Sequence, residues 1–495
     1  MKYISTRGGG MPVSSAEAIK QGLCEDGGLF MPSDIPMLSI GEIEALMERS
    51  YPERAAFILG KFLTDYTADE LLSDATEAYS SERFPVGATG IHTLSDMSML
   101  ELFHGPTCAF KDMALQIMPR LFRRALLKTD EKRTALILVA TSGDTGKAAL
   151  EGYRDIDNIK IQVFYPTDGV SKVQKLQMQT QVGKNVSVYG IRGNFDDAQN
   201  GVKRIFADAQ IAKKLDGAST FLSSANSINW GRLVPQIVYY VSAYCDLVCR
   251  GEIVLGEQID VTVPTGNFGN IFACFVAKKM GLPIGKLVCA SNSNNVLTEF
   301  LTVGVYSRNR EFFKTISPSM DILISSNLER LLYLLFGTEK CRAYMQSFQT
   351  CGEYRLTDED LKAVKAHFVG YCADDDMTRE TIKTVFEEEK YLADTHTAVA
   401  ICCARAYMRE SEVQRKMLTV STASPYKFAS DVLSALGAVP EADGVGVLDE
   451  LFAFSALDIP SSLGELSQRE IRFSDIIAKD GMESAVLSFA EERAN

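Results

Sequence analysis

The chain has 495 residues, of which 46% are hydrophobic and 23% charged, and its net charge at pH 7 is −13. This length predicts two or three domains, and an acidic chain without a block of Lys and Arg argues against nucleic acid as a partner. No apolar run reaches the roughly 20 residues of a membrane span, and the first residues lack an apolar signal core. We therefore expect no membrane contact and a cytoplasmic location.

The first 92 residues favour helices. The patterns predict helices at 14–22, 39–50, 51–63 and 68–81, and Pro85, Gly87 and Gly90 mark the end of this region. We predict an N-terminal, mainly helical domain over residues 1–92, in which no residue points to chemistry.

Apolar strand-like runs begin after Ser98 and alternate with helical stretches. The predicted strands are 134–140, 159–165, 185–191, 259–264, 286–291 and 417–421. Such alternation predicts an α/β fold with parallel sheets covered by helices, and ligands are expected at the carboxyl ends of the strands. We assign residues 93–440 to this core in two subdomains with the active site between them, and 441–495 to a C-terminal helical extension with helices at 474–479 and 483–493.

Lys111 lies between turn residues (His104-Gly105-Pro106-Thr107) and a helix-compatible run from Met113 to Lys128 that contains Pro119. An amine held there loses water, which lowers its pKa and makes it a nucleophile. Such a lysine is a candidate for a Schiff base with a carbonyl compound or pyridoxal phosphate. The alternative is an ordinary solvated lysine at a helix start.

A glycine loop follows the strand at 259–264 and opens a helix at 271–280. Its residues are Gly266, Asn267, Phe268, Gly269 and Asn270. Converging N–H groups at a helix start form a seat for phosphate, although a plain strand-to-helix turn has the same pattern. The loop lacks the Gly-Lys-Ser/Thr of a P-loop and the G-x-G-x-x-G of a dinucleotide fold, so neither ATP nor NAD is implied.

Three further polar clusters are candidate anion or cofactor sites. Ser142, Asp144 and Thr145 open another helix, although Asp144 could instead cap it. Asn226, Ser227 and Arg232 offer donors to an oxyanion, or form an N-capped surface helix. Thr422 ends the strand at 417–421, where its hydroxyl could bond a heteroaromatic nitrogen or cap a turn. The four His and eleven Cys show no metal-ligand spacing, so no metal is expected.

Together these residues explain an aldehyde–phosphate cofactor and an anionic substrate, and at these residues the chain resembles the threonine synthase family of fold-type II pyridoxal-phosphate enzymes. The matching motifs cover nearly the whole chain: His104-Gly105-Pro106-Thr107, Ala109-Phe110-Lys111-Asp112, Ser142-Gly143-Asp144-Thr145-Gly146, Asn226-Ser227-Ile228-Asn229, Gly266-Asn267-Phe268-Gly269, and Thr422-Ala423 with Pro425 and Lys427-Phe428. The resemblance implies two open, parallel-type sheets covered by helices and an extra helical N-terminal domain.

The resemblance also implies roles for these residues. Lys111 forms the Schiff base with pyridoxal 5'-phosphate, the loop from Gly266 to Asn270 holds the cofactor phosphate, and Thr422 faces the pyridine nitrogen. The substrate is O-phospho-L-homoserine, which reacts with water to give L-threonine and phosphate. The residues matched to its carboxylate and phosphate are Ser142, Asp144, Thr145, Asn226, Ser227 and Arg232.

Other readings stay open. A phospho-lyase releasing 2-oxobutyrate would carry nearly the same motifs, and a non-catalytic binding protein could keep the fold. Ser424 and Tyr426 flank Pro425 where relatives carry His before the proline, which puts an imidazole role there in doubt, and His396 could be structural. For the assembly we expect a monomer or a homodimer.

Overall fold

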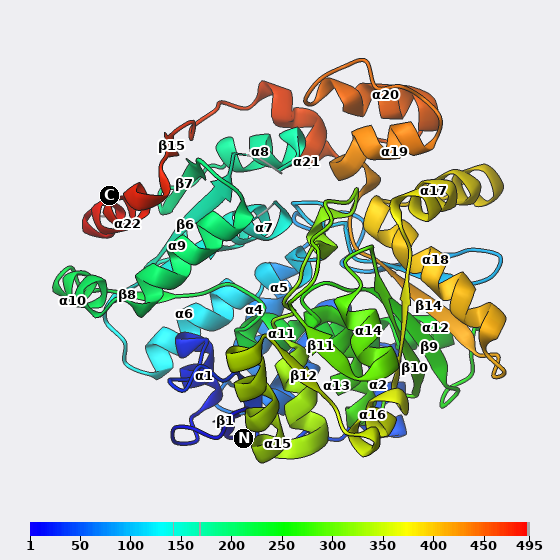
Figure 1. Cartoon of the computed structure of the whole chain (residues 1–495), viewed down its shortest axis with the longest axis horizontal. Helices are drawn as coiled ribbons and strands as arrows, with labels where there is room; N and C mark the ends of the chain where they lie inside the picture. Colours follow the sequence, from blue (N-terminus) through cyan, green and yellow to red (C-terminus); the bar gives the residue numbers. More distant parts are fainter. Residues whose placement is uncertain (142, 168–169, 493–495) are drawn as a thin grey trace.

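A computed structural model of the chain describes residues 1–141, 143–167 and 170–492. Figure 1 shows two main β-sheets with helices packed around them and further helices near the N-terminus. The predicted α/β fold class is therefore confirmed. None of the helices in these described ranges combines the length and apolar character needed to cross a bilayer.

The N-terminal region is mainly helical, and its helices begin at capping residues. Ser39 and Thr67 each accept a hydrogen bond from the backbone of a glutamate three residues later, and that glutamate accepts one from the cap backbone. These reciprocal bonds satisfy donors that a helix start leaves free. The elements of this region are β1 (Tyr3–Ser5), α1 (Ser15–Gln21), β2 (Phe30–Pro32), α2 (Ile40–Met47), α3 (Tyr51–Phe62) and α4 (Ala68–Ala78).

The larger sheet has six strands in the order β13-β10-β9-β14-β4-β3, in which β3 pairs antiparallel with β4 and the other pairs are parallel. Every residue of β9 is buried, as expected where helices cover both faces of a parallel sheet. The strands are β3 (Gly90–Thr93), β4 (Ser98–Glu101), β9 (Ile259–Pro264), β10 (Ile284–Ser291), β13 (Phe368–Cys372) and β14 (Lys416–Ser421). Helices nearby are α12 (Pro235–Cys249), α13 (Gly269–Met280) and α18 (Thr395–Glu410).

The second sheet has five strands in the order β15-β7-β6-β5-β8, all paired in parallel. They are β5 (Thr134–Ala140), β6 (Ile159–Pro166), β7 (Val186–Ile191), β8 (Thr220–Ser223) and β15 (Ile476–Ile477). Helices that pack on this sheet are α7 (Asp144–Tyr153), α9 (Phe195–Ala207) and α10 (Ala209–Gly217), and α8 (Lys172–Gln179) packs on α7. The long strands of both sheets are predicted from the sequence, but the short β3, β4, β8 and β13 are not.

The run from Met113 to Lys128 is not one helix, because it divides into α5 (Asp112–Leu115) and α6 (Met118–Lys128). Pro119 lacks the N–H that would bond the carbonyl of Leu115 in a continuous helix. That carbonyl lies against Gly152 of α7, where an added Cβ atom would come within 1.8 Å of its oxygen. The break therefore lets α7 approach the segment that follows Lys111.

The C-terminal extension also differs from the prediction. The helix expected at 474–479 is wrong: Ile476 and Ile477 form β15, and the N–H groups of Gly190 and Arg192 donate to the carbonyls of Asp475 and Ile477 at 2.9 and 3.0 Å. The edge of β7 thus determines the structure of this segment. Figure 1 shows the extension, orange to red, passing from α20 (Gly446–Ser455) to α22 (Met482–Glu491) beside the five-stranded sheet. The domain boundaries after residues 92 and 440 stay predictions.

The remaining elements connect these layers. They are α11 (Trp230–Leu233), α14 (Val296–Val303), β11 (Val305–Ser307), α15 (Leu328–Cys351), β12 (Glu353–Arg355), α16 (Asp358–Lys365), α17 (Asp375–Glu389), α19 (Ala429–Ala435) and α21 (Ser461–Gly464).

Candidate active site

The candidate residues gather where strands of the two sheets end. Strands β4, β14 and β9 are neighbours in the larger sheet, and the segments after them carry Lys111, Thr422 and the glycine loop. Strands β5 and β8 are neighbours in the second sheet and lead to Thr145 and Arg232. Parallel strands end at one edge of a sheet, so each sheet brings its candidates to a common edge.

The segment that carries Lys111 is fixed to the segment after β14. The N–H of Phe110 donates to the carbonyl of Thr422 at 2.8 Å, and the N–H of Ser424 donates to the carbonyl of Cys108 at 3.0 Å. Ala109 and Ala423 form the β-bridge between them. Lys111 and Thr422 therefore lie on adjoining backbone segments, and Ser424 contributes its backbone to this contact.

The amine of Lys111 is held in a nearly closed setting. Its side chain is 11% exposed, and Nζ lies 3.3 Å from Oδ2 of Asp144 and 4.5 Å from the ring centre of Phe110. Burial lowers the pKa of Lys111 most strongly; Asp144 opposes this shift, whereas the charges of Arg232 and Lys427 add to it. A lysine with a lowered pKa can serve as nucleophile and base.

Asp144, predicted as a substrate ligand, lies between two lysines, and its role toward the substrate stays a prediction. Its Oδ1 accepts from Nζ of Lys427 at 2.9 Å and from Nε2 of Gln174 at 2.7 Å, while its Oδ2 faces Lys111. Burial acts to raise the pKa of Asp144, but the two lysines and Gln174 bring it well below its usual range. An ionised carboxylate offers no donor to an anion, so the structure places Asp144 among lysines instead. It is the first residue of α7, after the cap position at Gly143.

Arg232 and Thr145, expected at one site, are brought together. Nη2 of Arg232 donates to Oγ1 of Thr145 at 3.3 Å, and Nη1 donates to the carbonyl of Ala225 at 2.9 Å. Burial lowers the pKa of Arg232 to about 10, and no acidic side chain within the described ranges pairs with it. A buried guanidinium without a counter-ion is suited to bind an anion. Ser142, predicted at the same site, lies outside the described residues.

The glycine loop is shaped so that its N–H groups stay free. The carbonyl of Gly266 accepts from Oγ of Ser325, and that of Asn267 accepts from the backbone N–H and Nδ2 of Asn327. Phe268 has a left-handed backbone, with φ of 61°, and α13 starts directly after it. Across the described part of the chain, the N–H groups of residues 266–269 have no acceptor.

Two details favour a phosphate in this loop. A Cβ atom on Gly266 would lie 3.0 Å from the carbonyl oxygen of Ser319, so the backbone here leaves little room for a side chain. Asn270 accepts hydrogen bonds from the hydroxyls of Tyr239 and Tyr240, yet its buried Nδ2 has no partner in the described ranges. Unpaired donors at a helix start suit a dianion.

Ser227 belongs to the neighbourhood of this loop. Nδ2 of Asn327 donates to Oγ of Ser227 at 3.0 Å as well as to the carbonyl of Asn267 at 2.9 Å. The predicted cluster of Asn226, Ser227 and Arg232 is thus spread along a segment, with Arg232 beside Thr145 and Ser227 beside the loop.

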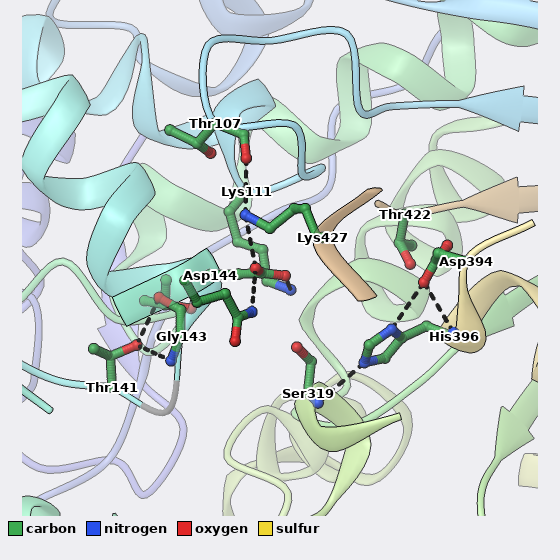
Figure 2. A network of polar contacts seen from close by, with 12 residues as sticks. Thr107, Lys111, Thr141, Gly143, Asp144, Ser319, Asp394, His396, Thr422 and Lys427 are labelled. Carbon is green, nitrogen blue, oxygen red and sulfur yellow. Dashed lines mark hydrogen bonds and ion pairs between the residues drawn. The ribbon is translucent and has the colours of Figure 1, made fainter. Parts of the chain in front are cut away.

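A buried carboxylate links Thr422 to His396. Oγ1 of Thr397 accepts from the N–H of Thr422 at 3.2 Å and donates to Asp394. Asp394 also bonds Nδ1 of His396 at 2.8 Å, and Nε2 of His396 accepts from the N–H of Ser319 at 3.0 Å (Figure 2). Both ring nitrogens of His396 are engaged, and the imidazole joins the segment around Ser319 to the start of α18.

Four residues that organise the site have no role predicted from the sequence. These are Asp394, Asn327, Arg330 and Lys427. Lys427 was noticed as part of a motif but received no role. Arg330 is fully buried and donates to the carbonyls of Ser227 and Ile228. Asn327, Arg330 and Lys427 have partners far away in sequence, and a buried lysine or arginine could have been suspected only from the apolar residues around it.

These features fit pyridoxal phosphate. Lys111 is an amine for its aldehyde, the loop from Gly266 to Asn270 offers unpaired N–H groups for its phosphate, and Thr422 offers a hydroxyl for its ring nitrogen. The fold and site define a pyridoxal-phosphate-dependent enzyme, and the family model of that description matches residues 87–423.

Family models that match the two ends of the chain identify the family within this class of enzymes. The models "Threonine synthase N terminus" and "Threonine synthase, C-terminal" match residues 2–79 and 397–486. The chain belongs to the threonine synthase family, so the predicted resemblance and cofactor are confirmed.

Relatives agree along nearly the whole length. The threonine synthase of Pseudomonas aeruginosa is 37% identical over 475 residues, which cover 95% of each chain. That of Schizosaccharomyces pombe is 37% identical over 468 residues, covering 88% of this chain and 89% of the relative. The crystal structure of PLP-bound threonine synthase from Brucella melitensis superposes with a TM-score of 0.88 at 36% identity, covering 99% of this chain and 100% of that one.

Proposed function

We propose that the protein converts O-phospho-L-homoserine and water into L-threonine and phosphate. The observation that carries this proposal is a nearly buried lysine of lowered pKa in the same site as a buried arginine that has no acidic partner among the described residues. The first group suits proton transfer, and the second suits a substrate that carries both a carboxylate and a phosphate. Membership in the threonine synthase family supports the choice of reaction.

The cofactor and Lys111 have different roles in this reaction. Pyridoxal phosphate, when bound, supplies a conjugated ring that delocalises negative charge from a substrate carbon. Lys111 would hold the cofactor through its nitrogen, and its free amine takes and returns protons at the substrate carbons as a general base. Burial lowers the pKa of Lys111, so its neutral form is more accessible than that of a solvated lysine.

The anion-binding residues stabilise the departure of phosphate from the γ-carbon before water adds at the β-carbon. Arg232 and Thr145 are the donors for one anionic group of the substrate, and Asn226, Ser227 and Ser142 are proposed for the rest. Thr422 would offer a hydroxyl, rather than a carboxylate, to the ring nitrogen of the cofactor, and a neutral partner there would leave that nitrogen less readily protonated and disfavour transamination.

Product analysis tests the proposal. Purified enzyme loaded with pyridoxal phosphate is incubated with O-phospho-L-homoserine, and threonine, 2-oxobutyrate and phosphate are quantified together. We expect threonine and phosphate in equal amounts. Mostly 2-oxobutyrate would identify a phospho-lyase instead, and no phosphate release would indicate a binding protein.

Lys111→Ala is the matched control for this experiment. It should abolish turnover and the adduct that borohydride fixes to the protein, while circular dichroism shows an intact fold. Turnover retained by this variant would remove Lys111 from the proposed chemistry.

A further inference from the structure

Two lysines share one carboxylate at the centre of the site. Oδ1 of Asp144 lies 2.9 Å from Nζ of Lys427, and Oδ2 lies 3.3 Å from Nζ of Lys111. Figure 2 shows Lys427 reaching Asp144 from one side while Lys111 comes from the segment after Thr107. Lys427 has no place in the chemistry proposed above, although its side chain is fully buried.

The Nζ atom of Lys427 is surrounded by oxygen atoms. Besides Asp144, its Nζ donates to the carbonyl of Thr107 at 2.8 Å and to Oε1 of Gln177 at 3.1 Å. An ammonium has three donors, and all three have acceptors here. These acceptors and the neighbouring carboxylate compensate the cost of burying this lysine.

The count of charges explains why a second lysine is useful. If Asp144 faced Lys111 alone, the two would form a buried ion pair, and the amine of Lys111 would be kept protonated. Lys427 neutralises the carboxylate, so Lys111 can lose its proton without leaving a buried negative charge uncompensated. Asp144 still holds the amine in place by its hydrogen bond.

The other charged groups near the two lysines come from separate elements. Arg232, from α11, acts on Lys111 in the same direction as Lys427. Asp112, from α5, accepts hydrogen bonds from the N–H and Oγ1 of Thr107 at 2.8 and 2.7 Å, and burial raises its pKa to about 6. The thiol of Cys108 also lies within the field of Lys427, and burial raises its pKa to about 11.

We propose that Asp144 and Lys427 act as a pair of positioning residues that set the place and the protonation of the Lys111 nitrogen. Asp144 orients the nitrogen and favours its charged form, and Lys427 limits that preference so that the nitrogen can also serve as a base. This proposal rests on the proposed function only because that function names the reaction in which the Lys111 nitrogen acts as a base. Its effect on Lys111 is measured without substrate, so failure of either proposal can be told from failure of the other.

The pair predicts opposite effects for its two members. Asp144→Asn removes the negative charge, so the nitrogen of Lys111 should lose its proton at lower pH than in the wild type. Lys427→Met removes a positive charge and leaves Asp144 uncompensated, so the nitrogen should keep its proton to higher pH. A charge at this distance shifts such a midpoint by about one to three pH units.

The test uses the holoenzyme. The absorbance of the cofactor bound to Lys111 is titrated against pH for the wild type and both variants, with cofactor content and thermal denaturation recorded for each. In parallel, competitive acetylation of full-length protein stripped of cofactor measures the free amine of Lys111 by peptide mass spectrometry. Where the absorbance shows no midpoint in the accessible pH range, or where a variant binds no cofactor, the acetylation measurement gives the direction of the shift.

Two controls separate charge from packing. Lys427→Arg keeps the charge and should stay closer to the wild type than Lys427→Met. Lys147→Met removes another buried lysine of the same region, one that pairs with Glu151 at 3.2 Å, and should leave the midpoint of Lys111 unchanged. Opposite shifts for the two main variants support the pair. Shifts in the same direction, no shift in either, or an equal shift in Lys147→Met would overturn it.

Discussion

Gly152→Ala should be strongly destabilising, because α7 and α5 approach each other at this glycine. A Cβ atom there would lie 1.8 Å from the carbonyl oxygen of Leu115 and 3.4 Å from Cγ of Pro119. A carbon–oxygen contact needs about 3.3 Å, so the helices would have to separate by about 1.5 Å. Overpacking in a buried contact typically costs about 1–3 kcal/mol, and backbone against backbone places this variant at the upper end.

The assay compares apparent melting temperatures at a fixed scan rate, since a chain of this size need not unfold reversibly. Gly60→Ala is the matched control. It lies inside α3, and its Cβ would contact only Cδ1 of Leu71, at 3.6 Å. Helix propensity alone favours alanine by up to about 1 kcal/mol, so this control should melt at or above the wild-type temperature.

The contact between α5 and α7 also affects the candidate active site. Separating α7 from α5 moves Asp144 relative to Lys111, so Gly152→Ala should lose cofactor more readily than the wild type on dialysis. If Gly152→Ala melts at the same temperature as Gly60→Ala and keeps its cofactor, the reasoning is refuted, because the added Cβ atom would then cause no steric clash at Gly152.

Three further predictions concern other parts of the molecule. Arg232→Ala should keep the cofactor spectrum but lower kcat/KM about 10²–10³-fold, as the loss of a donor to a developing charge does in other enzymes. Steady-state kinetics with phosphohomoserine measures this change. An unchanged kcat/KM would remove Arg232 from the site. Asn327→Ala removes the hydrogen bonds to Ser227 and to the glycine loop. The dissociation constant of the cofactor, measured by fluorescence titration, should therefore rise about 5- to 30-fold. A value equal to that of the wild type would show that these hydrogen bonds do not support cofactor binding. Burial, with nearby lysines, lowers the pKa of His367 to about 4, below its unfolded value, so its stabilising effect is complete above pH 6.5 and is lost as pH falls towards 4. His367→Phe should therefore flatten the fall in melting temperature across that interval, and an identical pH profile would contradict it.

The sequence could predict elements whose pattern is local. Long apolar strands such as β5 and β9, and helices with capping boxes such as α2 and α4, appear near their expected bounds because neighbouring residues determine them. The segment at 476–477 shows the opposite case. Its few residues are compatible with a helix, but the free edge of β7 offers hydrogen bonds that only the folded chain brings within reach.

The same distinction applies to the site. Lys111, the glycine loop and Arg232 stand in local settings of turns, strand ends and helix starts, so their chemistry could be predicted one segment at a time. Asp144 has a local setting too, and there it resembles a polar residue at an anion site. Its actual neighbours, Lys111 and Lys427, come from segments far apart in the chain. Because the charge of a buried carboxylate is set by what surrounds it, the position of Asp144 between Lys111 and Lys427 could be inferred only from the fold.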